Sequence, residues 1–328
     1  MAEILAIAAS APGLVVADKQ TGEWMVRQRS LENQAVTSLV ADGRQMLAGT
    51  RDGIYRSVDL GQTWAEANDG LSIRHVRWLS LHPDFPERVF AGTEPAGIFV
   101  SHDFGSSWRS CPEVEEMRER YGWSLPYSPE SGCVRGFTFQ AERGYAAVED
   151  GCVLVSKDAG ETWGLAQGSR GYPDHGPQQG FVHSDVHSIA VQPASPERVA
   201  APTGGGFYSS NDGGKTWVDL YRYHYSRAVW LDPGDLDRMI LGPADGVDRD
   251  GRIEETRDGG RTWLNASRGL QVPWRNHMVE RFAQAGGELL AVLSNGVLLA
   301  ADISELAWRR ILPEVKGINA AIAIRVEE

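Results

Sequence analysis

Charged or imidazole side chains recur at one position when seven short segments are aligned. The segments begin at Gln34, Arg74, Gly132, Ser184, His224, His277 and Gly317. The fourth positions hold Thr37, Arg77, Arg135, His187, Arg227, Glu280 and Ala320. The first two positions add His75, Asp185, His224, Tyr225 and His277. Arginine binds carboxylate or phosphate through two parallel N–H donors. The three arginines therefore predict a positive cup for an anion, provided that the fold brings the segments together.

Other chemistry is open to the same residues. Glu280 or Asp185 would serve as general acid or base, and His187 would shuttle a proton. Together with Glu280 or Asp185, the histidines could instead ligate Zn, Fe or Mn; these candidates are His75, His187, His224 and His277. A third interpretation is purely structural, with the arginines paired to Asp185 and Glu280 around a wet channel.

An eight-residue motif, Ser/Thr-x-Asp-x-Gly-x-Thr/Ser-Trp, indicates which elements position these segments. Its five copies are 57–64, 101–108, 156–163, 210–217 and 256–263. Two worn copies, 17–24 and 301–308, keep the tryptophan. Each copy follows a short strand and precedes another, so it predicts a hairpin turn. The Asp carboxylate accepts backbone N–H groups of the turn, as Asx turns do, and the Gly supplies a positive φ. We expect these aspartates to be structural rather than metal or substrate ligands.

The tryptophans of the seven copies are spaced by 40, 44, 55, 54, 46 and 45 residues. That spacing is typical of a four-stranded propeller blade, with the tryptophan packed between neighbouring blades. The sequence thus predicts an all-β, seven-bladed β-propeller forming a single domain, residues 1–328. The expected blades are 1–31 plus 317–326, 32–71, 72–112, 130–168, 183–220, 224–268 and 276–312.

Individual strands follow from apolar runs between turns. In the third blade we expect strands at 76–81, 88–92, 97–101 and 107–111. The first blade supplies only 4–9, 14–18 and 24–29, and an unpaired strand, 318–325, ends the chain. The C-terminal strand is therefore expected to become the inner strand of the first blade, which removes exposed sheet edges.

The repeated motif resembles the BNR, or Asp-box, repeat of sialidases, xyloglucanases, sortilin-type receptors and photosystem assembly factors. The resemblance covers nearly the whole chain and implies a fold more than a function. Sialidases also clamp a substrate carboxylate with an arginine cluster, and by analogy Tyr225 would be a nucleophile. Sialidases have six blades and an Arg-Ile-Pro start, and this chain has neither feature.

Long connections mark one face of the predicted ring, which we call the top. They are 112–132, 166–184 and 243–253, and length variation of this kind accompanies function. The aromatic residues in these connections are Tyr121, Trp123, Tyr127, Tyr172 and Phe181, with His175 beside them. They predict either a wall for a ligand or ordinary packing of the connections against one another.

Composition limits the classes of partner that the protein is expected to bind. The net charge is −12 and no basic run is present, which disfavours nucleic acid and anionic membranes. No apolar stretch approaches the ~20 residues that span a bilayer. The N-terminus lacks the basic region of a signal peptide, and three cysteines favour a reducing compartment. We therefore expect a cytoplasmic protein.

These observations favour an enzyme, a hydrolase or lyase, that acts on a small anionic or glycan-like substrate at the top of the channel. The expected substrate-binding residues are Arg77, Arg135, Arg227, His75, His224 and His277. One alternative is a non-catalytic propeller that binds a ligand or a protein partner, as an assembly factor does. Another is a metalloenzyme with a divalent metal held by histidines.

Overall fold

Short runs of β-branched, aromatic and alanine residues between glycine-bearing turns form the strands. In the computed structural model, the third blade comprises β8 (Val76–Leu81), β9 (Val89–Thr93), β10 (Ile98–Ser101) and β11 (Arg109–Ser110). These strands pair with antiparallel neighbours in that order. β9 and β10 are buried along their whole length because other blades cover both faces of the sheet. The predicted strands of this blade are confirmed to within two residues.

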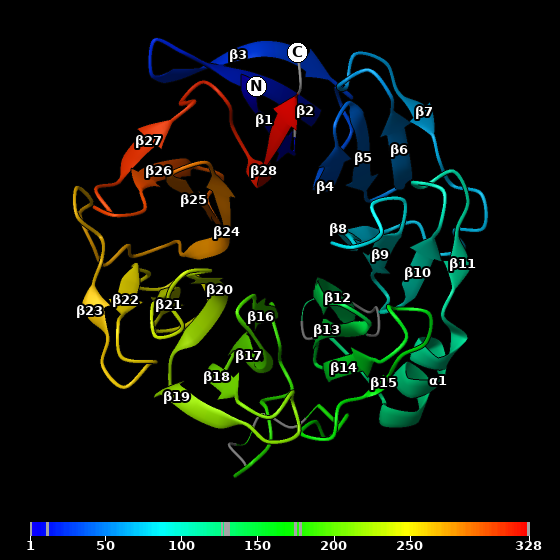
Figure 1. Cartoon of the computed structure of the whole chain (residues 1–328), viewed down its shortest axis with the longest axis vertical. Coiled ribbons are helices and arrows are strands. Elements are labelled where there is room, and N and C mark those ends of the chain that lie inside the picture. The colour runs from blue at the N-terminus through cyan, green and yellow to red at the C-terminus, as the bar shows by residue number, and fades with distance from the viewer. Residues whose placement is uncertain are drawn as a thin grey trace.

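Seven such sheets surround a central channel (Figure 1), so the predicted seven-bladed propeller is confirmed. The structure describes residues 2–10, 13–125, 127, 132–173, 176 and 179–326, which leaves His175 outside the described residues. The second blade comprises β4 (Val36–Asp42), β5 (Gln45–Thr50), β6 (Gly53–Ser57) and β7 (Ala65–Glu66). The fourth comprises β12 (Cys133–Gln140), β13 (Arg143–Glu149), β14 (Cys152–Ser156) and β15 (Gly164–Leu165).

The remaining blades repeat this order from the channel outward. The fifth comprises β16 (Ala190–Gln192), β17 (Ser195–Thr203), β18 (Gly206–Ser210) and β19 (Val218–Arg222). The sixth comprises β20 (Tyr225–Leu231), β21 (Met239–Ala244), β22 (Glu254–Thr256) and β23 (Leu264–Asn265). The seventh comprises β24 (Val279–Ala285), β25 (Glu288–Leu293), β26 (Leu298–Asp302) and β27 (Arg309–Ile311).

The two ends of the chain close the ring within the first blade. β28 (Ile318–Val326) pairs antiparallel with β1 (Ala2–Ala9), so that Ile324 lies opposite Ile4. β2 (Gly13–Gln20) and β3 (Glu23–Ser30) complete the sheet. Figure 1 shows β28, in red, beside β1, in dark blue. The expected closure is confirmed, and each edge strand on the channel side is covered by its neighbours.

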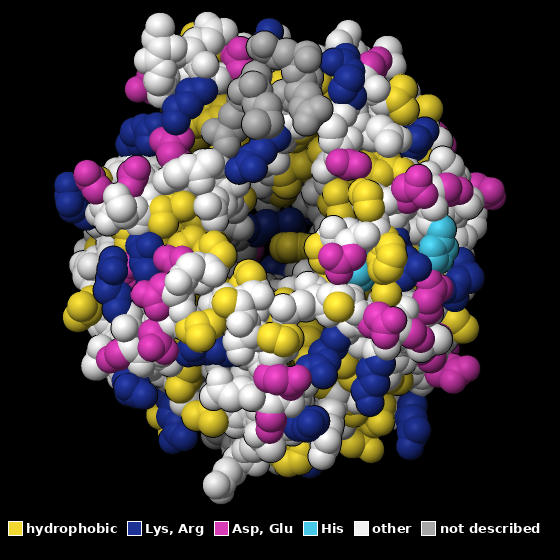
Figure 2. Space-filling view, viewed as in Figure 1, with side chains coloured by type: hydrophobic (Ala, Val, Ile, Leu, Met, Phe, Trp, Pro, Cys, Tyr) yellow, Lys and Arg dark blue, Asp and Glu magenta, His cyan; other side chains and the backbone are white. Residues whose placement is uncertain are grey.

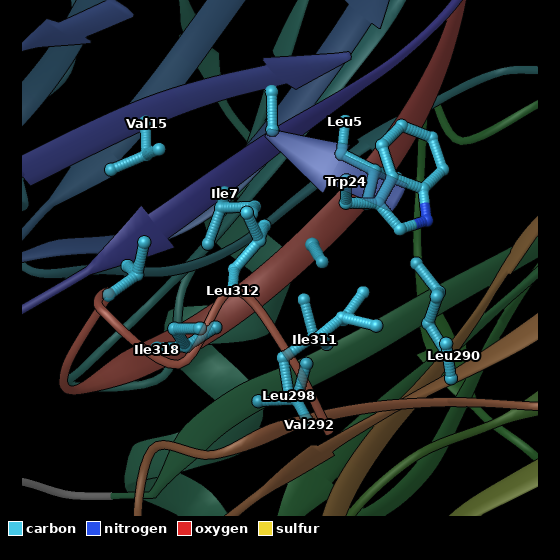
Figure 3. Close-up of a cluster of buried hydrophobic side chains, with 14 of the residues drawn as sticks. Leu5, Ile7, Val15, Trp24, Leu290, Val292, Leu298, Ile311, Leu312 and Ile318 are labelled. Carbon is cyan, nitrogen blue, oxygen red and sulfur yellow. The ribbon is translucent and has the colours of Figure 1, made fainter. Parts of the chain in front are cut away.

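The hydrophobic core is divided among the blade interfaces. Seven clusters of buried side chains are present among the described residues, one between each pair of neighbouring blades. Figure 3 shows the cluster at the closure, where Leu5 and Trp24 of the first blade meet Leu290 and Val292 of the seventh. The Trp24 indole N–H also reaches Glu288 of the seventh blade, at 3.2 Å. The motif tryptophans therefore join blades, as predicted.

The eight-residue motif forms the turn between the two outer strands of a blade. In the fourth blade, the Asp158 carboxylate accepts the Ser156 hydroxyl at 2.7 Å, the Thr162 amide at 3.0 Å and the Thr162 hydroxyl at 2.6 Å. The Gly160 amide donates to the Ser156 hydroxyl at 2.8 Å. Equivalent bonds surround the aspartates of the other four copies, Asp59, Asp103, Asp212 and Asp258. Each of these carboxylates is used locally.

One helix departs from the expectation that 112–132 is only a connection. α1 (Pro112–Tyr121) begins with proline in its first turn, and Gly122 ends it with a left-handed φ of 65°. Acidic residues in the first turn and basic residues in the last complement the helix dipole. These helix signals are local and are present in the sequence. Among the described residues no helix is long and apolar enough to span a bilayer.

Candidate ligand site at the channel mouth

Irregular pairing in the inner strands aims polar side chains at the channel. The register shifts between Val76 and Trp78 in β8, and again between Val134 and Gly136 in β12. The residue passed over is an arginine in both strands. Corresponding shifts pass over Thr37 in β4, Arg227 and Ala228 in β20, and Glu280 in β24. A β-bulge re-aims a side chain that strict alternation would direct into a blade core. This explains why one aligned position tolerates charge.

In two blades the structure departs from the sequence alignment. The irregularity in the first blade passes over Asn319, and Ala320 lies in a buried cluster. Asn319 donates to the Val36 carbonyl at 2.8 Å, so it takes the position expected for Ala320. The fifth inner strand starts only at Ala190, so His187 precedes the strand. In the first blade, the position aligned from the sequence is therefore one residue too late.

A cavity of about 440 Å³ lies at the channel mouth. Its charged lining consists of Arg51, Arg77, Arg135, Arg281 and Glu280. The neutral polar lining includes Ser10, Thr37, Ser294 and Asn319. Figure 2 shows the open channel with Lys or Arg side chains, in dark blue, inside it. Arg77 and Arg135 thus share one cavity, and Arg227 contacts Arg135's partner Glu280 but is not part of the lining.

Carboxylates neutralise most of these guanidiniums. Arg77 pairs with Glu94 at 2.9 Å, and Arg135 pairs with Glu149 at 2.9 Å. Glu280 lies between Arg135, at 3.5 Å, and Arg227. Although burial alone would raise it, the two guanidiniums hold the pKa of Glu280 below its usual value. Glu280 is therefore ionised, and the guanidiniums that lower its pKa also make it a weak proton acceptor.

Glu94 and Glu149 were missed by the sequence analysis. Glu149 ends β13 directly opposite Cys133, and Glu94 follows β9 and bonds to His75 through its backbone amide, at 3.0 Å. Each glutamate lies at the end of the second strand of a hairpin, opposite the aligned segment that begins the first strand. Pairing each inner strand with the strand that follows it would have revealed them, because hairpin register places these residues side by side.

Arg281 is a third residue that the sequence analysis missed. Its guanidinium lies 4.0 Å from the centre of the Trp78 ring and donates to the Thr37 carbonyl at 3.2 Å. No described carboxylate forms an ion pair with it. Burial and the neighbouring positive charge of Arg135 lower the pKa of Arg281 to about 9. Keeping Arg281 charged at this buried place therefore costs free energy. A bound anion would reduce that cost.

A second, larger groove lies between the fifth and sixth blades. Its volume is about 760 Å³, and its lining includes Asp219, Tyr223, His224, Tyr225 and Asp245. Burial raises the pKa of the Asp219 carboxyl above its usual value. Tyr223 is 82% exposed and has a φ of 62°, a backbone conformation that is rare for a bulky residue. Two predicted site residues, His224 and Tyr225, therefore face the groove rather than the channel cavity.

Tyr225 packs against two other predicted site residues. Its ring is 4.7 Å from the His187 ring and 5.2 Å from the Arg227 guanidinium. Burial raises the pKa of its phenol, which keeps the hydroxyl protonated at neutral pH. The arrangement suits a hydrogen-bond donor, because a nucleophilic phenolate would need the opposite shift in pKa.

The four candidate histidines do not converge on one point. His75 lies 3.8 Å from Glu94, His224 lies 3.7 Å from Asp245, and His277 stacks on Trp274 at 5.1 Å. Only His187 belongs to a group of three or more ligand side chains in the described part of the chain. Asp185 lies 3.3 Å from His187 and not beside an arginine, so the expected structural network holds for Glu280 alone.

Aromatic residues of the long connections divide between packing and exposure. Trp123 is buried and donates to the Gly171 carbonyl at 2.7 Å, and Tyr121 meets Tyr172 edge to face at 5.1 Å. These contacts tie the two connections together. Tyr127 is exposed instead, and its side chain hydrogen-bonds Glu149. The structure thus supports mutual packing for part of the set.

Comparison with known proteins supports the fold. No family model matches the chain. One curated protein, the oligoxyloglucan-reducing end-specific xyloglucanase of Emericella nidulans, is 27% identical over 58% of this chain. The chain spans only 27% of that relative's length.

Solved structures resemble nearly the whole chain. A GH74 enzyme of Niastella koreensis has a TM-score of 0.65 at 15% identity, and the match covers 96% of this chain and 52% of that one. An ancestral GH74 enzyme has a TM-score of 0.62 at 16% identity, over 89% of this chain and 38% of that one. YCF48 bound to D1 peptide has a TM-score of 0.62 at 14% identity, over 91% and 89%. The chain is a seven-bladed propeller, and its fold is similar to those of the GH74 enzymes and of YCF48.

Proposed function

We propose that the protein binds a small anionic, glycan-like ligand in the cavity at the channel mouth. The observation that carries this proposal is that Arg51 and Arg281, two guanidiniums lining a cavity of about 440 Å³, form no ion pair with a described carboxylate. Cavities of roughly 300–1,000 Å³ hold small ligands. The ligand's acid group would lie against Arg281, which forms no ion pair with a described carboxylate. The glycan-like character rests on the hydroxyl and amide groups of the lining and on the similarity to a xyloglucanase.

The binding proposal is tested by thermal unfolding with glucuronate and, separately, with glucose. At a concentration about 100 times its Kd, a ligand stabilises the folded state by about 2.7 kcal/mol, which raises the Tm by several degrees. Glucuronate should produce this shift and glucose should not. Arg281→Gln and Arg51→Gln should each reduce the shift, because each removes a positive charge from the cavity.

Arg109→Gln is the matched control. Arg109 is exposed on the outer strand β11 and pairs with Glu161 at 2.6 Å, away from the channel. This variant should keep the full glucuronate shift. An equal shift in Arg281→Gln and wild type would place the binding elsewhere, and no shift with glucuronate or galacturonate would reject a sugar-acid ligand.

Hydrolysis of a glycosidic bond is a second candidate function, favoured by Asp219. Its raised pKa keeps a carboxylic acid protonated closer to neutral pH, as a general acid requires. Asp245 lines the same groove and would serve as the partner carboxylate. Turnover is measured as release of reducing ends from xyloglucan oligosaccharides and from oligogalacturonate.

Asp219→Asn should lower turnover at least about 100-fold with little change in KM, since general acid–base catalysis contributes about 10²–10⁴-fold. Asp42→Asn, an exposed aspartate at the end of β4, should retain activity. If wild-type protein binds glucuronate but releases no reducing ends from either substrate, hydrolysis is rejected. The protein would then be a non-catalytic propeller that binds a ligand.

A further inference from the structure

Three ligand-type side chains meet where the fourth and fifth blades join, outside the arginine-lined cavity. They are Glu149 at the end of β13, and Asp185 and His187 in the extended segment before β16. One potential ligand atom from each lies within 4.8 Å of the others. The group therefore brings two carboxylates and one imidazole from different blades to one point.

Local structure explains why these side chains converge. Asp185 and His187 are two residues apart in a segment bonded to the end of β17, through His187 N to the Pro202 carbonyl and Gly204 N to the Asp185 carbonyl. Alternate residues of an extended segment share a face. Gly204 leaves space for the carboxylate, because a Cβ there would lie 2.1 Å from Asp185 Oδ2.

Glu149 is fixed from the other side. Its Oε2 accepts from the Arg135 guanidinium at 2.9 Å and from the Cys133 thiol at 3.2 Å. Contacts of this kind orient metal-ligating carboxylates. The carboxylate is thus held toward the fifth blade without help from Asp185, whose negative charge repels it.

His187 supplies an independent observation. Its side chain is 0% exposed, yet its Nδ1 has no hydrogen-bond partner in the described structure. Its Nε2 lies 3.3 Å from Asp185 Oδ2, and Asp185 Oδ1 is also unpartnered. Buried polar atoms are normally satisfied. A species that accepts electron pairs from both groups would satisfy them together.

We propose that Glu149, Asp185 and His187 bind a divalent transition-metal cation. An imidazole with two carboxylates suits Zn²⁺, Mn²⁺ or Fe²⁺ better than Mg²⁺ or Ca²⁺, which prefer oxygen ligands alone. The cation offsets the repulsion between the two carboxylates and occupies an imidazole nitrogen. Three protein ligands leave a coordination position for water or for a ligand group. The site differs from the four-histidine set considered from the sequence, since it uses only His187 of that set.

Protonation is the competing explanation. A proton on His187 would give a buried imidazolium paired with Asp185, with no metal. The experiment therefore measures metal binding directly. Chelator-treated, full-length protein is titrated with ZnCl₂ or MnCl₂ by calorimetry, and bound metal is counted by elemental analysis after desalting. MgCl₂ and CaCl₂ serve as competitors.

Wild type should bind one equivalent of Zn²⁺ or Mn²⁺ that a hundredfold excess of Mg²⁺ does not displace. Asp185→Asn and His187→Gln should each weaken binding at least about tenfold, as loss of even an orienting contact does at metal sites. His277→Gln is the matched control: it starts the corresponding segment of the seventh blade and stacks on Trp274, and it should bind like wild type.

Absence of binding by wild type at millimolar metal would overturn the proposal and leave the imidazolium–carboxylate pair. Binding that is equal in wild type and Asp185→Asn would overturn it as well. If His187→Gln loses its near-ultraviolet circular dichroism, Asp185→Asn and Glu149→Gln provide the comparison. The Mn²⁺ electron paramagnetic resonance signal of wild type is a further readout, because it broadens only if the ion binds the protein.

Discussion

Two sets of carboxylates in this molecule are held by several donors each, and the donors come from different distances along the chain. Asp158 of the eight-residue motif is held by Ser156 and Thr162, at most four residues away. Glu280 of the channel mouth is held by Arg135 of the fourth blade and Arg227 of the sixth. The first arrangement forms within one turn. The second exists only when the ring is closed.

This difference bears on what each carboxylate contributes. Donors within a turn satisfy an exposed carboxylate wherever the turn folds. The motif can therefore be repeated in every blade without leaving a carboxylate unpaired. At the mouth, guanidiniums and carboxylates are partly withdrawn from water, and each charge depends on a partner in another blade. Such paired charges tie the blades together, whereas Arg281, which forms no ion pair with a described carboxylate, remains available to a ligand.

The largest expected effect follows from removing a guanidinium at the mouth. Arg135→Ala leaves Glu149 and Glu280 without a shared cation, and breaking a buried pair in this way costs about 3–5 kcal/mol. Urea denaturation should report that loss in the free energy of unfolding. Arg143→Ala, which removes an exposed pair with Glu197, should cost under about 1 kcal/mol. Equal losses in both variants would erase the contrast between mouth and surface.

A smaller effect is expected in the motif. Asp158→Ala removes the acceptor of two hydroxyls and one amide, but water can replace it at an exposed turn, so the loss should be about 1 kcal/mol. Lys157→Ala, at the exposed neighbouring position, should change the free energy of unfolding by less than about 0.5 kcal/mol. A loss in Asp158→Ala that matches Arg135→Ala would mean that the turns hold the ring together as strongly as the mouth does.

The smallest effect concerns pH. Hydrogen bonds from Thr216 and Ser210 outweigh burial and lower the pKa of Asp212 from 3.8 to about 2. Because the folded-state pKa is depressed, this stabilisation is complete above about pH 4 and is lost as the pH falls toward 2. Asp212→Asn should be less stable than wild type at pH 5, with the difference shrinking between pH 4 and pH 2. Unfolding curves at a series of pH values measure it.

Asp42→Asn is the control for the pH series, since Asp42 is exposed at the end of β4 and outside any copy of the motif. Its difference from wild type should stay flat across the same range. A constant difference in Asp212→Asn would show that protonation of the motif aspartate does not contribute to acid unfolding.

Much of the fold was predictable because its signals are local. The motif fixes turns, and the tryptophan spacing fixes the number of blades. The missing inner strand of the first blade predicts the pairing of β28 with β1. Helix α1 was also encoded locally, in Pro112 and Gly122, and was overlooked. Strand bounds in the third blade were within two residues.

The candidate site was predictable only in part. Alignment placed Arg77, Arg135 and Glu280 at one level of the ring, and the structure gathers them around one cavity. It did not reveal Arg281 or Asn319, because a bulge advances the register by one residue, and the sequence does not mark which residue is passed over.

The sequence by itself determined that seven blades form, where their outer turns lie and which blade the chain ends close. The tertiary structure alone decided which charges meet: Glu280 with Arg135 and Arg227, and Glu149 with Asp185 and His187. The physical reason is the range of the interactions. Turns and blade cores use neighbours in sequence, whereas the channel joins strand ends whose approach depends on bulges, ring closure and the packing of every blade.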